Sequence, residues 1–121
     1  MRVKEVQEIL EAEVLSGSSY LDYKVDFGYG CDLMSDVLAF VKNNVILLTG
    51  LMHQQVIRTC EMLDIKAIVI VRGKTPSEEL ISLADEKGMI LLTTKHSLYS
   101  ACSLLYSKGL MGEEIAHEIK F

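Results

Sequence analysis

The chain has 121 residues and 50% of them are apolar, which predicts one domain with one core at the usual ~100–200 residues per domain. Its 17 acidic residues outnumber its 12 basic ones, and the net charge of −5 argues against a dedicated nucleic-acid binder, whose phosphate contacts need a basic surplus. The apolar runs are shorter than the ~18 residues of a membrane span, and nothing after Met1 resembles a signal peptide. We therefore expect a soluble, cytoplasmic protein with neither a membrane nor a nucleic-acid partner.

The three cysteines predict no metal or redox centre. Cys31, Cys60 and Cys102 are too far apart for a Cys-x-x-Cys pair, and an odd number of cysteines in a cytosolic chain indicates buried thiols. The sequence also contains no His-Glu-x-x-His motif and no Asp-x-Asp loop. We expect neither a bound metal nor a cofactor.

The first thirty residues combine a short helix with short extended segments. Apolar residues recur at helical spacing over residues 2–12, which predicts an amphipathic helix, and Val14-Leu15 can begin a short strand. Gly17-Ser18-Ser19 predicts a turn. Apolar and polar residues alternate over 21–25, as in a half-exposed strand, and we interpret Gly28-Tyr29-Gly30 as a flexible turn.

A second helix is predicted to begin at Asp32, a favourable N-cap, and to end at Asn43-Asn44. Met34 and Phe40 are expected on its exposed side. Its inner side is expected to carry Leu33, Val37, Leu38 and Val41.

Continuous apolar runs at 45–48, 67–71 and 89–92 are typical of strands buried on both faces. A helical pattern follows each of them. Consecutive strand-helix-strand units require parallel pairing and right-handed crossovers. The sequence therefore predicts an α/β fold, a three-layer α/β/α sandwich around a mostly parallel sheet.

The three helices after these strands differ in how clearly they begin. One runs through residues 55–64. The next is predicted to begin with Thr75 as N-cap and Pro76 at its first position, with Glu78 three residues after the cap. The last passes through residues 98–105 and is expected to stop at Gly109.

The loops after the three buried strands form the candidate site. In an open parallel sheet, ligands bind outside the carboxyl ends of the strands, next to helix N-termini. These loops carry basic, hydroxyl and glycine residues and no carboxylate, which favours binding of a small anion such as a nucleotide or a phosphorylated metabolite. The competing interpretation is that they only solvate loops and cap helices. The candidate residues are Thr49, Gly50, His53, Arg72, Gly73, Lys74, Thr93, Thr94, Lys95 and His96.

Neither a P-loop nor a dinucleotide fingerprint is present. Gly73-Lys74-Thr75 matches the end of a P-loop, but the motif needs a glycine five positions before its second one, and that position is Ile68. No Gly-x-Gly-x-x-Gly follows a strand. Capping explains Thr75 better.

A catalytic set is equally incomplete in the sequence. His53 and His96 could act as acid or base only with a partner within ~3 Å, and neither has one nearby in sequence. Ser35 and Asp36 are adjacent, so their side chains diverge by ~100° on a helix. The alternative function is a small enzyme on a phosphorylated metabolite, with His53 or His96 as the acid-base residue.

Five segments of the chain together carry a recognisable pattern. They are Cys31-Asp32-Leu33-Met34-Ser35-Asp36-Val37-Leu38-Ala39, Leu48-Thr49-Gly50, Ile68-Val69-Ile70-Val71-Arg72-Gly73, Pro76-Ser77-Glu78-Glu79 and Leu91-Leu92-Thr93-Thr94. In this order and spacing they resemble a DRTGG domain over roughly residues 1 to 110. The same layout is similar to the N-terminal domain of HPr kinase/phosphorylase, which is distinct from the P-loop kinase domain that follows it. The 111–121 segment would then be a C-terminal tail.

The resemblance implies regulation. DRTGG domains occur beside nucleotide-sensing CBS domains in some inorganic pyrophosphatases and before the catalytic domain of some phosphotransacetylases. The resemblance thus implies a non-catalytic regulatory or interaction domain, without the kinase activity of HPr kinase.

Self-association is expected because the chain is too small to bury all of its apolar half and because DRTGG domains commonly contribute to dimerisation. We predict a homodimer, with another protein as an alternative partner. Apolar residues at 111, 115 and 119 would form one row of a helical tail. The candidate interface comprises Met34, Ser35, Asp36, Phe40, Leu110, Met111, Ile115, Ile119 and Phe121.

Overall fold

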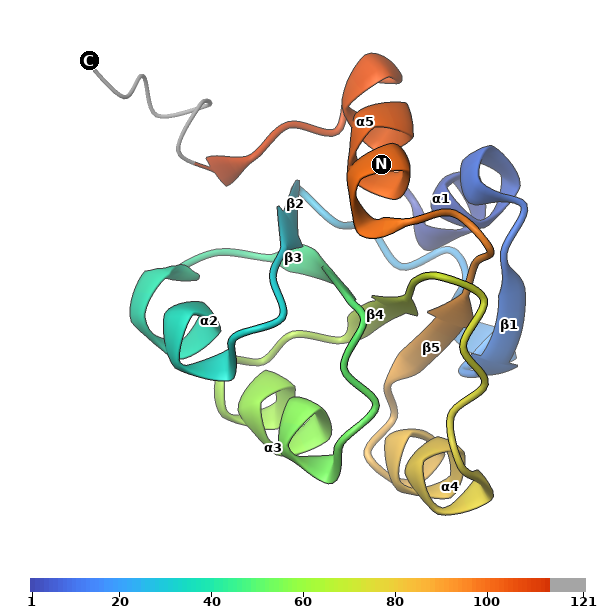
Figure 1. Ribbon diagram of the computed structural model, residues 1–121, viewed down its shortest axis with the longest axis vertical. Helices are drawn as coiled ribbons and strands as arrows, with labels where there is room; N and C mark the ends of the chain where they lie inside the picture. The colour runs from blue at the N-terminus through green and yellow to red at the C-terminus, as the bar shows by residue number, and fades with distance from the viewer. Residues whose placement is uncertain (114–121) are drawn as a thin grey trace.

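The computed structural model describes residues 1–113, and within them five strands form one sheet in the order β1-β5-β4-β3-β2 (Figure 1). Strands β2 to β5 are parallel to one another, and β1 pairs antiparallel with β5 at one edge. The predicted mostly parallel sheet is confirmed. The strands are β1 (Glu13–Ser16), β2 (Phe27–Gly30), β3 (Val45–Thr49), β4 (Ala67–Ile70) and β5 (Ile90–Thr93).

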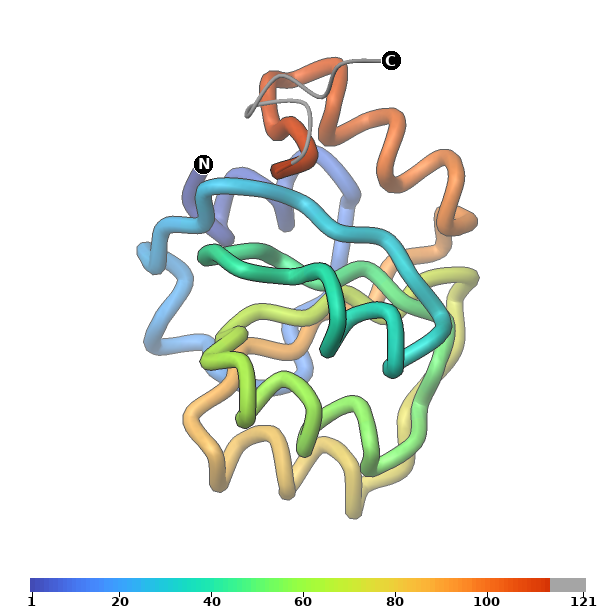
Figure 2. The backbone as a smooth tube through the Cα atoms, turned by 90° about the vertical axis from the view of Figure 1, so that its left-hand side faces the viewer, coloured from blue at the N-terminus to red at the C-terminus, as the bar shows by residue number. Residues whose placement is uncertain are grey.

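Helices cover both faces of this sheet. Helices α1 and α5 lie on one face, and α2, α3 and α4 lie on the other, so that the sheet forms the middle of three layers (Figures 1 and 2). A single 3-10 turn, η1 (Ser18–Tyr20), follows β1. No helix within residues 1–113 is long and apolar enough to cross a bilayer. The helices are α1 (Val3–Leu10), α2 (Met34–Phe40), α3 (Gln54–Met62), α4 (Glu78–Glu86) and α5 (Leu98–Ser107).

The continuous apolar runs are buried because the three central strands have a helix layer on each side. Every residue of β3 and β4 is buried. Alternate side chains of one strand enter different cores: Ile46 and Leu48 pack in the α1/α5 layer, and Leu47 packs in the α2/α3/α4 layer. The period of two along each strand therefore joins two cores through one sheet.

The expected strand at 21–25 is wrong, and so is the turn at Gly28-Tyr29-Gly30, because the edge strand β2 is Phe27–Gly30. Residues 21–24 instead follow the 3-10 turn and pair with the start of α1, where the amides of Val3 and Lys4 donate to carbonyls of that segment. Glycine is tolerated in β2 because its backbone lies directly beneath α5, and a Cβ on Gly30 would stand 2.7 Å from Cys102 Sγ.

The start and the buried side of α2 also differ from the prediction. The N-cap is Leu33, not Asp32. Met34 is only 3% exposed and belongs to the core, whereas Leu33 and Leu38, expected inside, are exposed. The helix begins one residue later than its cap signal indicates, and its buried side comprises Met34, Val37 and Val41.

Helix α4 also begins later than predicted. Ser77 is its N-cap, and its hydroxyl accepts a hydrogen bond from Leu80 N at 3.2 Å. Thr75 and Pro76 therefore precede the helix, and the Pro76 ring is buried against the fold. Two candidate capping residues, Thr75 and Ser77, stand close together there, and the register of the buried face decides between them.

The segment after α5 lies against the outer edge of β2. Leu110 is buried, contrary to its predicted place in an interface, and packs over Gly28. The amide of Gly28 donates to Met111 O at 3.0 Å. The carboxylate of Glu113, 9% exposed, accepts from Asn43 Nδ2 at 2.7 Å and from two backbone amides at 3.3 Å. The predicted tail residues Ile115, Ile119 and Phe121 lie outside the described residues.

Candidate functional site

The carboxyl ends of β2 to β5 meet at one edge of the sheet, because these strands are parallel and in register. We call this the carboxyl edge and define it by Asp32, Gly50, Arg72, Lys74 and Lys95. Four of these residues are in the loops that the sequence singled out, and Asp32 is not.

The turn after β4 is held in a left-handed conformation. Arg72 and Gly73 have φ angles of 68° and 66°, and a side chain disfavours this region at Arg72. Two backbone hydrogen bonds oppose this cost: Arg72 N donates to His96 O at 2.7 Å, and Gly73 N donates to Thr94 O at 2.8 Å. A Cβ on Gly73 would stand 3.8 Å from Lys95 Cα, so the two loops lie next to each other. The loops after β4 and β5 are thereby joined side by side.

Lys74 joins a third loop to this pair. Its Nζ donates to Gly50 O at 2.9 Å, and its own carbonyl accepts from Thr93 Oγ1 at 2.8 Å. Lys74 thus positions the loop after β3, and its ammonium group already has a carbonyl acceptor.

Asp32 supplies a carboxylate that the sequence analysis did not place here. Its Oδ1 accepts from Gly50 N at 2.7 Å and from Thr49 Oγ1 at 2.9 Å. These are backbone and hydroxyl donors of the kind that an external anion would use at the start of a helix. An internal carboxylate therefore occupies the donors at the end of β3. Recognising 27–30 as a strand would have placed Asp32 at the carboxyl edge.

Gly50 provides the space in which Asp32 and Arg72 approach each other. A Cβ on Gly50 would stand 2.8 Å from Arg72 Nη2 and 3.4 Å from Asp32 Oδ2. Gly50 does not have a positive φ, so its backbone does not require glycine. The missing side chain lets the guanidinium group lie directly over the loop.

The threonines of the predicted set are used internally. Thr49 donates to Asp32, and Thr93 donates to Lys74 O. The Thr94 hydroxyl is buried and donates to Leu10 O at 2.8 Å. These three hydroxyl groups join the ends of β3 and β5 to neighbouring loops and to the end of α1.

The histidines do not form a catalytic pair within residues 1–113. His53 is the N-cap of α3, and its Nδ1 accepts from Gln55 N at 3.1 Å. His96 is half-buried and contributes its backbone to the Arg72 turn. Across these residues no hydrogen bond joins either imidazole ring to Ser35 or Asp36, so the structure does not assemble the alternative acid-base set.

Arg72 and Lys95 are the cations of this edge that face solvent. Both are exposed, and within the described part of the chain neither side chain has a hydrogen bond or an ion pair. Their loops are fastened together as described above. The structure thus places the three predicted cations at one edge and distinguishes Arg72 and Lys95 from Lys74, whose ammonium group has a carbonyl acceptor.

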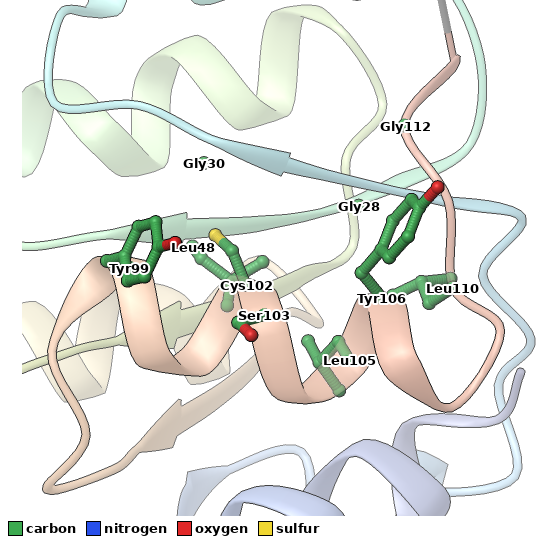
Figure 3. A pocket seen from close by; sticks show the side chains of 10 residues that line it. All are labelled: Gly28, Gly30, Leu48, Tyr99, Cys102, Ser103, Leu105, Tyr106, Leu110 and Gly112. Carbon is green, nitrogen blue, oxygen red and sulfur yellow. The ribbon is translucent and has the colours of Figure 1, made fainter. Parts of the chain in front are cut away.

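A groove of about 360 Å³ lies between α5 and β2 (Figure 3). Tyr99 and Tyr106 project from α5 at its two ends, with Cys102 between them, facing Gly30 and Gly28 of the strand (Figure 3). Burial raises the pKa of the Cys102 thiol. No local sequence pattern predicts this groove, because it depends on how α5 crosses β2.

The fold and the cationic edge define an α/β module with no group of three metal-ligating side chains among residues 1–113. The chain belongs to the DRTGG domain family, whose family model matches residues 5–107. No curated protein matches the chain.

A solved structure with the same fold is "Crystal structure of the CBS and DRTGG domains of the regulatory region of Clostridium perfringens pyrophosphatase complexed with activator, diadenosine tetraphosphate". The two chains are 19% identical and superpose with a TM-score of 0.69. The match covers 86% of the present chain and 45% of the other, so the present chain spans less than half of that regulatory region.

Proposed function

We propose that this chain is a non-catalytic, cytoplasmic regulatory domain that senses a nucleotide or another small phosphorylated anion at the carboxyl edge. The observation that carries the proposal is the pair Arg72 and Lys95, two exposed cations without protein partners in the described residues, on loops fastened together by backbone hydrogen bonds. In a chain of net charge −5, such a pair attracts anions locally. The free state of Cys31, Cys60 and Cys102 fits a reducing compartment.

Family membership supports a regulatory role. The DRTGG domain of the clostridial pyrophosphatase is part of a regulatory region complexed with a dinucleotide activator, and that region also contains CBS domains. The present chain aligns with less than half of it. The support for anion binding by the present chain is therefore its own pair of exposed cations, Arg72 and Lys95.

Thermal shift measurements test this proposal. AMP, ADP, ATP, diadenosine tetraphosphate and sulfate are added at millimolar concentration, and stabilisation that falls with added salt is expected for at least one nucleotide. Replacing both Arg72 and Lys95 by alanine should abolish the shift. The matched control replaces Arg58 and Lys4, two exposed cations on α3 and α1, and should leave it unchanged. No shift with any of these anions would refute the proposal.

Lys74 is left out of this variant. Because Lys74 holds the Gly50 carbonyl, its removal changes the loop as well as the charge. Arg72 and Lys95 have no such contact among the described residues, so their removal changes the charge more cleanly.

We further propose that the domain forms a homodimer through exposed apolar side chains at the two ends of α2. Leu33 and Phe40 are 57% and 63% exposed, unusual values for residues of this type. Ser35 and the half-buried Asp36 would border this surface. Light scattering at tens of micromolar should give twice the 13.5 kDa chain mass, and Phe40→Ser should lower it. A wild-type monomer would refute this part.

A further inference from the structure

The groove between α5 and β2 is built around bare backbone. Gly28 and Gly30 form its floor on the strand side, and neither has a positive φ, so neither is required by the chain conformation. The groove measures about 360 Å³, within the usual range of roughly 300–1,000 Å³ for small-molecule pockets.

Two exposed aromatic rings border this floor. Tyr99 is 85% exposed and Tyr106 is 53% exposed, which is more than packing of a lone domain would require. They are seven residues apart on α5, which places them roughly 10 Å apart along the helix axis, about the length of a nucleoside. Aromatic side chains at such a site are the usual stacking partners of a nucleobase.

One end of the groove lies toward the carboxyl edge. Gly30, the last residue of β2, lines the groove, and Asp32, whose carboxylate lies near Arg72 over Gly50, follows it two residues later. On the helix side Tyr99 lines the groove from the first turn of α5, and Lys95 is four residues before it in the chain. Because α5 follows the carboxyl end of β5, the chain leads from this end of the groove to the loops that carry Arg72 and Lys95.

From this arrangement we propose that a nucleoside phosphate occupies the groove, with its base against Tyr99 and its phosphate toward Arg72 and Lys95. This inference rests on the proposed function and deepens it, because it assigns the base as well as the anion. Binding of a base adds affinity that a bare phosphate lacks. The domain would then select nucleotides over other phosphorylated compounds.

The test compares AMP with ribose 5-phosphate, which has the same sugar and phosphate but no base. Isothermal titration of the full chain should show AMP binding about tenfold more tightly than ribose 5-phosphate, as stacking of one base supplies. In Tyr99→Ala this ratio should fall to about one. Because the Tyr99 side chain is exposed, its replacement should leave the fold intact, and circular dichroism of the variant checks this.

A second variant blocks the groove without removing an aromatic ring. Ser103 is exposed and lines the groove, so Ser103→Phe should fill it and reduce AMP affinity while leaving ribose 5-phosphate affinity unchanged. Tyr20→Ala is the matched control, because Tyr20 is 57% exposed and does not line the groove. It should bind AMP like the wild type.

The outcomes separate this inference from the proposed function. If AMP binds but its affinity is unaffected by Tyr99→Ala and Ser103→Phe, the groove assignment is wrong and the anion proposal stands. If Tyr99→Ala instead dissociates a dimer and leaves AMP affinity unchanged, a second copy of the chain occupies the groove. If neither AMP nor ribose 5-phosphate binds, the groove assignment fails, and the anion proposal fails with it only if the other anions of the thermal shift screen also give no shift.

Discussion

Replacing Asp32 by alanine should lower the stability of the fold and strengthen anion binding at the same time. The carboxylate accepts two hydrogen bonds, at 2.7 and 2.9 Å, and the Thr49 donor is buried. Hydrogen bonds to charged groups contribute ~1.5–3 kcal/mol each, and water can replace part of this at an exposed residue. We expect the free energy of unfolding to fall by about 2 kcal/mol.

The effect on binding comes from charge. A Cβ on Gly50 would stand 3.4 Å from Asp32 Oδ2 and 2.8 Å from Arg72 Nη2, so these two atoms are ~6 Å apart at most. At ~6 Å the Coulomb energy between two unit charges is roughly 0.7 kcal/mol in water. Removing the negative charge should therefore raise the affinity for a phosphorylated anion about threefold. Lower salt should enlarge this gain.

Urea denaturation measures the stability, and titration with AMP measures the affinity. Asp32→Asn is the matched variant, because it retains an oxygen acceptor and loses the charge. It should keep most of the stability and show the full gain in affinity. Unchanged stability in Asp32→Ala, or an anion affinity that falls in both variants, would contradict this account of the carboxyl edge.

Three further predictions concern the fold. Leu105→Ala removes a side chain that is 2% exposed between α5 and the sheet, and should cost ~2–5 kcal/mol in urea denaturation. Glu113→Ala should cost about 2 kcal/mol by loss of three hydrogen bonds, with Glu113→Gln in between; equal melting temperatures for all three proteins would disprove this. Burial raises the pKa of the Cys60 thiol from 9.0 to about 12, so above pH 9 the unfolded chain ionises while the folded chain does not. Above pH 9 the free energy of unfolding should then fall by up to ~1.4 kcal/mol per pH unit. The same dependence on pH in Cys60→Ala would refute this prediction.

Much of the fold could be predicted because the apolar runs of β3, β4 and β5 carry their own signal. Strand β2 could not, since two of its residues, Gly28 and Gly30, have low strand propensity, and its stability comes from pairing with β3 and from α5 above it. Propensity describes residues near in sequence, whereas α5 follows β2 by about seventy positions. Strand β2 therefore forms because of tertiary packing and not because of its local sequence.

The candidate site divides in the same way. Arg72 and Lys95 were predicted because they directly follow buried strands. Asp32 was missed because its partners are 17 and 18 residues away, and because the error over β2 hid its position. The hydrogen bond of Lys74 to Gly50 O likewise spans 24 residues, and no local pattern announces it.

The contact between the end of the described chain and β2 bears on how this domain behaves at high concentration. An unprotected edge strand offers its amides to any other strand and so templates aggregation. Here Met111 O accepts a hydrogen bond from the Gly28 amide, and the Glu113 carboxylate accepts one from Asn43 in the loop before β3. The other edge, β1, carries a register shift between Val14 and Ser16, which hinders regular pairing. Each edge of the sheet thus carries a feature that opposes the addition of a further strand, which lowers the tendency of the folded domain to aggregate through its edges.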